Sequence, residues 1–536
     1  MQDIVFFFKN FLIKIDNRVS NLDLLYGIIL LILLSTVLNF FFPLNYFFYI
    51  TIFFGFAFFL YGLQHKKIKI NFIYHLLILF SLTFIIYNHG DNIDTPMYHL
   101  QIIKWLYNEK VVFGLSNLEI RFGSSSLWFN LFALFKLKIN NYTNIYTFNL
   151  IPFSILIYQI FDKKIKLSFF FITLSISFLL FFSLLHPFAN GIILNHLHNT
   201  DLDTVGMVFF ILSFYLFIKF FEEEDIKTLR LLFVSSSLCI LIKLSYTYAS
   251  IFVLISIIKF YKKDLIQILK EKLNIFIIIL FLIWFLKNLI ISGCLIFPVI
   301  VTCFNPDWAP NIGEIDFFSK EIKGFARDTR DRLRYTDFNH TIYSLDWFMP
   351  WFKDYALNTA FIKISFFVSI FSFFFLFIFN YLKLLNTDFL KKIRDYFTIY
   401  LIFIPCFYVW FQAPEIRFGW GTFISVSCFS VAILMYHSKF NKIFKSWIFQ
   451  FVPIILLFLL IMDNGKNFSV YNLINPYIKN IDYSQIVKIN SVNGFEIYKS
   501  KNWQCFDFDK ICINSEKEKY DIYEKYNYLI IKSNFN

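Results

Sequence analysis

The chain alternates between long apolar stretches and short polar connections. A helix that crosses the hydrocarbon core of a bilayer needs roughly 17 to 25 mainly apolar residues, and about thirteen stretches meet that requirement. The predicted spans are residues 22–42, 45–63, 71–88, 144–161, 167–185, 203–221, 229–245, 247–260, 273–293, 356–380, 396–412, 418–436 and 446–462. The pattern therefore predicts an all-α polytopic membrane protein with about 13 transmembrane helices. We expect it to be embedded in the lipid bilayer.

Two polar connections are much longer than the others, residues 89–143 and 304–355. The first has the apolar spacing of helices that lie on a membrane surface. The second contains SKEIKGFARDTRDRLR, whose alternating charges are typical of a solvated helix or of a lid. The tail after the last span is more polar, and VNGFEIYKS in it predicts a turn followed by a strand. We expect a transmembrane domain over residues 1–462 and a small extracytoplasmic α+β domain over residues 463–536.

The lysines and arginines predict the orientation of the spans, because short cytoplasmic loops carry most of the positive charge. With a cytoplasmic N-terminus, every returning loop holds at least three basic residues, whereas residues 186–203 hold none. These basic loops are residues 64–70, 162–166, 219–230, 261–272, 382–396 and 436–447. An odd number of crossings then places the C-terminus outside. The first twenty residues are typical of an interfacial amphipathic segment rather than a cleaved signal peptide.

Hydrophobic residues make up 58% of the chain and charged residues 16%, which excludes an ordinary water-soluble globule. The formal net charge of +13 follows from the basic loops. It therefore gives no argument for a nucleic-acid partner, and we expect none. The motifs GxxxxGKS, HExxH and GxSxG do not occur, so a nucleotide-driven pump, a zinc hydrolase or a serine hydrolase lacks its minimal parts.

The seven cysteines fall into two groups. Cys505 and Cys512 lie in the polar tail, where an oxidising compartment would let them close a short loop, and we predict a disulfide between them. The others lie in or beside apolar stretches, where a thiol usually acts as a small hydrophobic side chain. These are Cys239, Cys294, Cys303, Cys406 and Cys428.

The segment HGDNIDTPMYHLQ follows the third predicted span and is unusually polar. Pro96 suits the first turn of a helix with Thr95 as its cap, which places Asp94 just before the helix begins. The segment therefore presents a carboxylate at the level of the lipid head groups. The candidate site residues from this loop are Asp94, Tyr98, His99 and Lys104.

Further polar residues lie at the outer ends of later spans. They are Asp201, Asp203, Lys243, Lys287, Asn288, Glu415 and Arg417. Simple structural roles stay open for them: an aspartate before a helix is often only an N-cap, a lysine can extend along the helix towards water, and Glu415 with Arg417 can form an ion pair in a turn. Ionisable groups at membrane depth nevertheless mark functional sites by default. Several at one face predict a pocket for a substrate that is part lipid and part phosphate.

The motifs DTPMYHLQIIKWL, GLSNLEIRFGSSSLWF, FLKNLIISGCLIFP and APEIRFGWG follow one another along the chain. In this order they resemble the GT-C membrane glycosyltransferases, the superfamily that includes aminoarabinose transferases acting on lipid A and protein mannosyltransferases, and within it a bacterial subgroup that also has paired tail cysteines. The superfamily places an acidic residue in the first large outer loop, often with tyrosine four positions later, and Asp94 and Tyr98 match this. Asp201 or Asp203 matches its second acidic residue. Two extra helices before the acidic loop and a short tail depart from the simpler members.

The resemblance spans most of the chain and implies a GT-C-like fold in the bacterial cytoplasmic membrane. It also implies transfer of a sugar from a polyprenyl-phosphate donor to a cell-envelope glycan, lipid or protein acceptor on the outer side. Such a transfer needs a base for the acceptor proton and positive charge at the departing phosphate. We expect Asp94 to be the base and Lys243, Lys287 and Arg417 to hold the phosphate. The other candidate substrate-binding residues are Tyr98, His99, Lys104, Asp201, Asp203, Asn288 and Glu415.

Two other functions stay open, an O-antigen-type polymerase and a transporter of lipid-linked oligosaccharides. A transporter should carry ionisable residues deep in many helices, whereas the predicted helix centres here are almost entirely Phe, Ile and Leu. A divalent cation also stays open as a cofactor, because several histidines map to the outer face beside the carboxylates. They are His89, His99, His186, His196 and His198.

Overall fold

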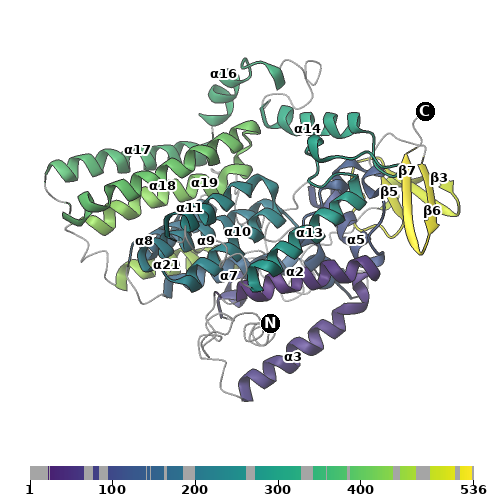
Figure 1. The fold of residues 1–536 in the computed structure, drawn as a ribbon, viewed down its shortest axis with the longest axis horizontal. Helices are drawn as coiled ribbons and strands as arrows, with labels where there is room; N and C mark the ends of the chain where they lie inside the picture. Colours follow the sequence, from purple (N-terminus) through teal and green to yellow (C-terminus); the bar gives the residue numbers. More distant parts are fainter. Residues whose placement is uncertain are drawn as a thin grey trace.

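The computed structural model is mostly helical, with a small group of strands near the C-terminus (Figure 1). It describes residues 22, 24–64, 77–83, 94–139, 142–144, 146–161, 166–184, 200–260, 272–327, 342–357, 359–382, 385, 387–438, 447–465, 483–513 and 520–533. The α-helices with given bounds are α2 (Leu24–Phe41), α3 (Phe48–Gln64), α5 (Leu100–Asn108), α6 (Trp128–Leu134), α7 (Leu150–Tyr158), α8 (Leu167–Leu184), α9 (Leu202–Glu223), α10 (Ile226–Ile242), α11 (Ser250–Phe260), α13 (Lys272–Ser292), α14 (Ile312–Arg327), α16 (Phe348–Trp351), α17 (Ala360–Tyr381), α18 (Thr387–Gln412), α19 (Ile416–His437) and α21 (Trp447–Gly465).

Seven helices in the described part of the chain are long and apolar enough to cross a membrane. They are α2, α8, α9, α13, α17, the segment Lys392–Gln412 of α18, and α19. The expectation of about 13 spans is therefore met only in part. Shorter apolar helices occupy Leu44–Ala57, Leu150–Phe161, Leu244–Lys259 and Phe451–Met462. Apolar runs alone do not distinguish a full crossing from a shorter buried helix, which explains the difference.

Each predicted span overlaps described helical residues. Of the span 71–88 only residues 77–83 are described, and these are helical. The predicted span 247–260 illustrates the shortening. Its first residues belong to a 3-10 segment, η9 (Leu244–Ala249), and only the rest forms α11. The chain bends at Tyr246, whose φ and ψ are not helical.

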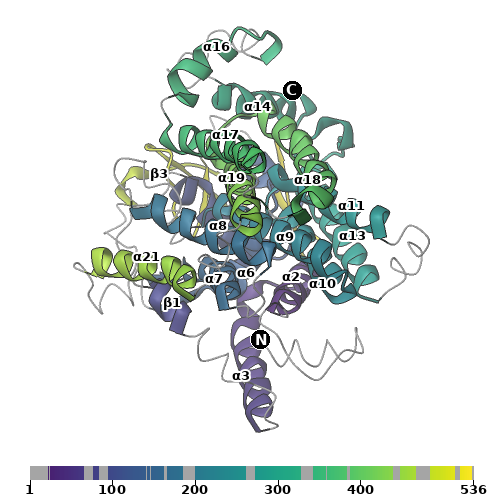
Figure 2. The ribbon, with the colours of Figure 1, turned by 90° about the vertical axis from the view of Figure 1, so that its left-hand side faces the viewer.

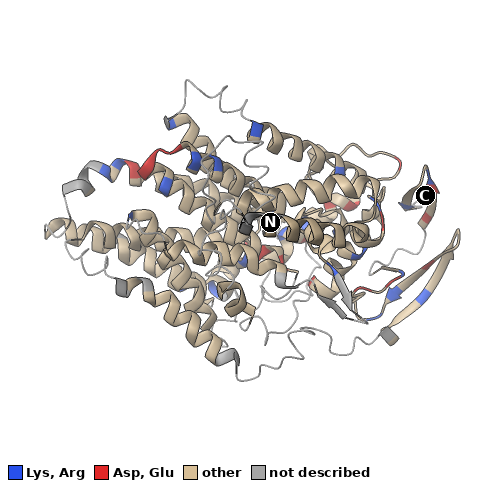
Figure 3. Cartoon of the chain, turned by 90° about the horizontal axis from the view of Figure 1, so that it is seen from below, with Lys and Arg blue, Asp and Glu red and all other residues tan. Residues whose placement is uncertain are grey.

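Helix α9 is the centre of the helical body. It packs against α8, α10, α11 and α19, which surround it in both ribbon views (Figures 1 and 2). Nearly all of its residues are buried, in agreement with a sequence that is apolar on every side. Phe214 shows how the bundle is filled, because its ring contacts Phe252, Phe403 and Phe429 from three other helices. Few charged residues lie within this body; most lie at helix ends and in the strands (Figure 3).

The short helices of the first long loop are part of the core. All residues of α6 are buried, so this helix does not lie on a membrane surface as its sequence predicted. Two hydrogen bonds hold it among its neighbours: Asn130 donates to Thr36 of α2, and the Trp128 indole donates to Asn149. The same loop contains a hairpin of β1 (Leu137–Ile139) and β2 (Tyr142–Asn144).

The C-terminal region forms two small sheets. Strand β4 (Phe495–Ser500) pairs with β3 (Ile486–Val492) antiparallel and with β5 (Ile511–Ile513) parallel, and β6 (Tyr520–Lys525) pairs with β7 (Tyr528–Ser533) antiparallel. An α+β domain was expected, but the described residues after 483 contain strands and one 3-10 turn, η13 (Tyr483–Gln485), and no α-helix. Cys505 and Cys512 form a disulfide there.

This C-terminal domain is joined to the first long loop by backbone and side-chain hydrogen bonds. Phe113 and strand β7 exchange backbone hydrogen bonds, with Phe113 donating to Leu529 and accepting from Ile531. Phe506 donates its backbone N–H to the Pro96 carbonyl, and Gln101 donates to the Phe506 carbonyl. The turn beside Asp94 therefore rests directly on the C-terminal domain.

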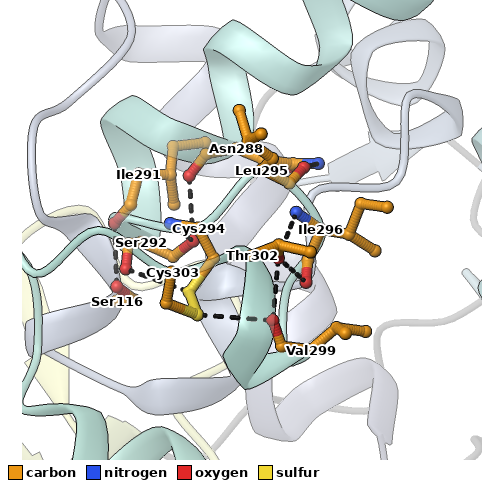
Figure 4. The surroundings of a disulfide bond; sticks show 10 residues. All are labelled: Ser116, Asn288, Ile291, Ser292, Cys294, Leu295, Ile296, Val299, Thr302 and Cys303. Carbon is orange, nitrogen blue, oxygen red and sulfur yellow. Dashed lines mark hydrogen bonds between the residues drawn. A yellow bond between two sulfur atoms is a disulfide. The ribbon is translucent and has the colours of Figure 1, made fainter.

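A second disulfide joins Cys294 and Cys303 after α13. Both cysteines were expected to act as small hydrophobic side chains, and the disulfide shows that this expectation is wrong. The loop between them is closed further by the Leu295 N–H, which donates to the Thr302 carbonyl, and by the Thr302 hydroxyl, which donates to the Ile296 carbonyl (Figure 4). An apolar loop of this kind is thus fixed at both ends.

Candidate functional site

A cavity of about 600 Å³ opens where the ends of several helices meet. One end is polar and is lined by Asp94, His99, Asp201, Asp203 and Lys243. Asp94 and His99 come from the start of the helical segment in the first long loop. Asp201 and Asp203 come from the beginning of α9, and Lys243 from the end of α10. The cavity thus gathers candidate residues that are distant in sequence.

Asp94 precedes a short π-helical turn, η3 (Thr95–His99), and faces Arg417 in the first turn of α19. Arg417 donates from Nη1 to Asp94 Oδ2 over 3.0 Å. Burial raises the pKa of the Asp94 carboxyl, but the charge of Arg417 and its hydrogen bond to the carboxylate act in the opposite direction and the pKa lies below its usual value. Asp94 is therefore ionised at neutral pH and held in a fixed direction.

Asp203 extends this charge network. Its carboxylate lies 2.9 Å from Lys243 Nζ and 3.9 Å from Arg417 Nε. Its side chain is only 2% exposed, so the two cations are needed to compensate a buried charge. Asp201 has a different role, because it is the N-cap of α9 and accepts the Asp203 backbone N–H at 3.0 Å. The simple capping explanation thus applies to Asp201.

His99 and Tyr98 form one side of the polar end. Burial lowers the pKa of His99 to about 4, although the nearby carboxylates of Asp94 and Asp201 act in the opposite direction. The ring is therefore neutral at pH 7, and its Nδ1 lies 3.0 Å from the Thr200 hydroxyl. Burial also raises the pKa of Tyr98, so its phenol stays protonated and can donate a hydrogen bond.

The rest of the cavity is mainly apolar. Part of the wall is the loop between Cys294 and Cys303, called the disulfide-closed loop below. Its Phe297, Val299 and Val301 line the cavity. Val301 is 92% exposed, so the loop presents apolar surface outside the cavity as well. Helix α14 contributes Ile322 and Lys323, and the end of α18 contributes Trp410. A polar end beside apolar walls suits an amphipathic ligand.

Four predicted residues, Lys104, Lys287, Glu415 and Arg417, are not among those that line this cavity. Arg417 lies behind the lining and contacts two of its carboxylates, Asp94 and Asp203. Lys104 donates to the Lys510 carbonyl and serves the contact with the C-terminal domain, and burial lowers its pKa to about 7. Lys287 is 1% exposed and donates to Asn130 over 2.6 Å. Glu415 accepts a hydrogen bond from the Tyr355 hydroxyl. Their neighbour Asn288 does line the cavity, where it bonds to Ser125.

The aromatic residues and the α14 residues that line the cavity were not predicted from the sequence. Trp284, Phe297 and Trp410 lie in apolar runs that gave no sign of a cavity. Lys323 lies in the charged segment of the second long loop, where its alternating pattern suggested a lid. It is a second cation that lines the cavity, besides Lys243.

Metal ligation has no support among the residues that the structure describes. No group of three or more His, Cys, Asp or Glu side chains there could hold a metal ion. Of the histidines considered above, His89, His186, His196 and His198 lie outside the described residues. His99 instead bonds to Thr200.

A family model described as "Domain of unknown function (DUF8201)" matches residues 5–424. The match covers every residue of the polar end of the cavity. No curated protein and no solved structure matches the chain.

Proposed function

The chain belongs to the DUF8201 family, whose function is unknown. From the cavity and from the resemblance of its motifs to the GT-C enzymes, we propose that it is a GT-C-like membrane glycosyltransferase. It moves a sugar from a polyprenyl-phosphate donor to a cell-envelope glycan, lipid or protein acceptor. The reaction takes place on the outer side of the bacterial cytoplasmic membrane, which the chain crosses several times from a cytoplasmic N-terminus to an extracytoplasmic C-terminus.

The observation that carries this proposal is the charge network Asp94–Arg417–Asp203–Lys243, of which Asp94, Asp203 and Lys243 line the polar end of a mainly apolar cavity. A polyprenyl-phosphate sugar has matching parts: an apolar chain, an anionic phosphate and a polyhydroxylated ring. Arg417 offers a fork of donors to phosphate oxygens, and Lys243 and Lys323 add positive charge. The apolar wall from the disulfide-closed loop meets the first units of the lipid chain.

Asp94 supplies the base for the transfer. The acceptor hydroxyl oxygen attacks the anomeric carbon while the bond from this carbon to the phosphate oxygen breaks. The phosphate leaves with the bonding electrons, and the hydroxyl proton passes to Asp94. When a phosphate engages Arg417, the ion pair with Asp94 weakens, which increases the basicity of the carboxylate at the time it is needed.

Replacement of Asp94 by asparagine tests the proposal. Loss of a general base lowers turnover by roughly two to four orders of magnitude, and the amide oxygen still accepts from Arg417, so the fold persists. The measurement is mass analysis of surface glycans and lipid-linked intermediates in a gene deletion complemented with wild type or D94N. Asp395→Asn is the matched control and should restore transfer, because it removes a carboxylate from an exposed ion pair with Lys259 that is not part of the cavity.

Loss of one sugar from the surface glycan, with its lipid-phosphate donor accumulating, supports the proposal. Shortened chains of unchanged composition indicate a polymerase instead. Accumulation of intact intermediates on the cytoplasmic side indicates a transporter. Full complementation by D94N contradicts the role of Asp94.

A further inference from the structure

A second pocket, of about 410 Å³, lies where helix α14 approaches the first long loop and the C-terminal domain. The loop contributes two short 3-10 segments, η4 (Leu115–Asn117) and η5 (Ile120–Gly123), and the C-terminal domain contributes Trp503. Figure 1 shows α14 close to the strands of that domain. The pocket is distinct from the cavity of the charge network.

Two aromatic side chains give this pocket an accessible apolar surface. Trp503 is 52% exposed and Phe317 is 58% exposed. Trp503 lies in the connection between β4 and β5 with φ of 63°, a conformation that non-glycine residues rarely adopt. Large aromatic rings left in water beside a pocket are costly for folding and typical of binding surfaces.

The polar lining of the pocket is predominantly acidic. Glu119, Glu314 and Glu321 face a single cation, Arg121. Arg121 is already close to Glu119, at 4.0 Å. An excess of carboxylates disfavours a phosphate or another anion. These carboxylates also form no metal-binding group among the described residues.

Carboxylates and aromatic faces together match a neutral sugar. A sugar ring has an apolar C–H face that packs on an aromatic ring, and hydroxyl groups around its rim that donate to carboxylate oxygens. Hydrogen bonds to an ionised acceptor are stronger than neutral ones. The side-chain carbonyl oxygen of Asn117, buried at the pocket and without a partner in the described structure, is a further acceptor for a donating group.

The two pockets share structural elements. Helix α14 lines the first cavity with Ser319, Ile322 and Lys323 and the second with residues on its other side. Between them, Phe318 of α14 stacks on Phe297 of the disulfide-closed loop at 5.7 Å. Arg121 of the second pocket lies over the ring of Tyr98, which lines the first. A ligand extended over α14 would reach both.

We propose that the second pocket binds a neutral sugar unit of the acceptor, and so selects a glycan acceptor whose reacting hydroxyl enters the first cavity. This inference rests on the proposed function where it identifies the sugar as part of an acceptor. Binding of the sugar to the second pocket does not depend on turnover.

The test is binding of neutral tetrasaccharides to the purified full chain in lipid nanodiscs, measured by saturation-transfer NMR and calorimetry. The probes are maltotetraose, chitotetraose and mannotetraose. We expect at least one to bind, and W503A to weaken it by about three- to tenfold, as loss of one aromatic stacking contact implies. Trp503→Phe keeps an aromatic face and should retain most of the affinity.

Tyr526→Ala is the matched control, because Tyr526 is an exposed aromatic residue with positive φ in the same domain but outside the pocket. D94N should bind the sugar like wild type, which separates this inference from the proposed function. Absence of binding by all three probes, or equal losses in W503A and Y526A, would overturn the inference. Sugar binding with no transfer by wild type would refute only the proposed function.

Discussion

Arg417 is the residue that makes the candidate site a single unit. It contacts Asp94, 323 residues away in sequence, and lies within 4 Å of Asp203. Because both carboxylates are largely shielded from water, neither is stable as an anion without a cation nearby. A ligand phosphate that forms an ion pair with Arg417 must therefore change the electrostatic environment of both Asp94 and Asp203.

His99 predicts a specific dependence of stability on pH. Its pKa is about 4 in the folded chain and about 6.5 in an unfolded one, so the unfolded state binds more protons between these values. The free energy of unfolding should therefore fall as the pH drops from 6.5 to 4, by up to about 3 kcal/mol from this residue. Thermal unfolding in nanodiscs between pH 4 and 7 measures this, with His99→Gln as the comparison. A constant difference between the two proteins at all pH values would contradict it.

At the scale of elements, the start of α9 is tightly packed. A Cβ atom added to Gly206 would lie 2.7 Å from the ring of Tyr246 and 3.3 Å from Cβ of Lys243. Tyr246 is fully buried and has no room to move. Lys243, whose Cβ an added methyl group would meet, is also the residue whose Nζ lies 2.9 Å from Asp203.

Gly206→Ala should therefore destabilise the protein by roughly 1 to 3 kcal/mol through overpacking and displace Lys243 from Asp203. Unfolding temperature and the Michaelis constant for the lipid-phosphate sugar measure the two effects. Gly55→Ala in α3 is the matched control, since no atom lies within 4 Å of its added Cβ. It should leave both quantities unchanged or stabilise slightly. Equal effects of the two substitutions would show that the packing around Gly206 is not limiting.

We expect the disulfide-closed loop to affect ligand binding more than the chemical step. Cys294 and Cys303 are nine residues apart, and the loop between them forms cavity wall but carries no group of the charge network. Under the proposed function, replacing both by serine should raise the Michaelis constant for the lipid donor more than it lowers kcat, because the wall loosens and the proposed base, Asp94, stays in place. Cys406→Ala, which removes a free buried thiol, is the control. A pure loss of kcat would assign the loop to the chemistry instead.

At the scale of the whole molecule, the hydrophobic pattern predicted the helices much better than their number of crossings. Helix α9 matches its predicted range closely, since it is apolar on all sides and buried on all sides. The break between the predicted spans 229–245 and 247–260 coincides with the bend at Tyr246. The second span was nevertheless predicted too long, because its first residues form η9 and periodicity contains no information on where neighbouring helices leave room. The same limit explains why α6 was expected at a surface and lies in the core.

The site residues were predictable in type and less so in position. Asp94, Asp203, Lys243 and Arg417 stood out as charged residues at the ends of apolar runs, and the structure brings them together. Lys287 fitted the same description, yet its amine is turned to Asn130. Which way a side chain points depends on packing partners far away in sequence, and the pattern around the residue does not encode them. For the same reason, the aromatic residues of the cavity wall could not be predicted from the sequence.

The contact between Gln101 and Phe506 joins residues 405 positions apart. At a ribosomal rate of roughly 5 to 20 residues per second, this segment is synthesised roughly 20 to 80 s after the turn that holds Asp94. During that interval the nascent chain already has Asp94 but not the C-terminal segment that supports its turn. Translation and insertion must therefore be finished before the protein becomes competent, and a truncated product left in the bilayer would be inert.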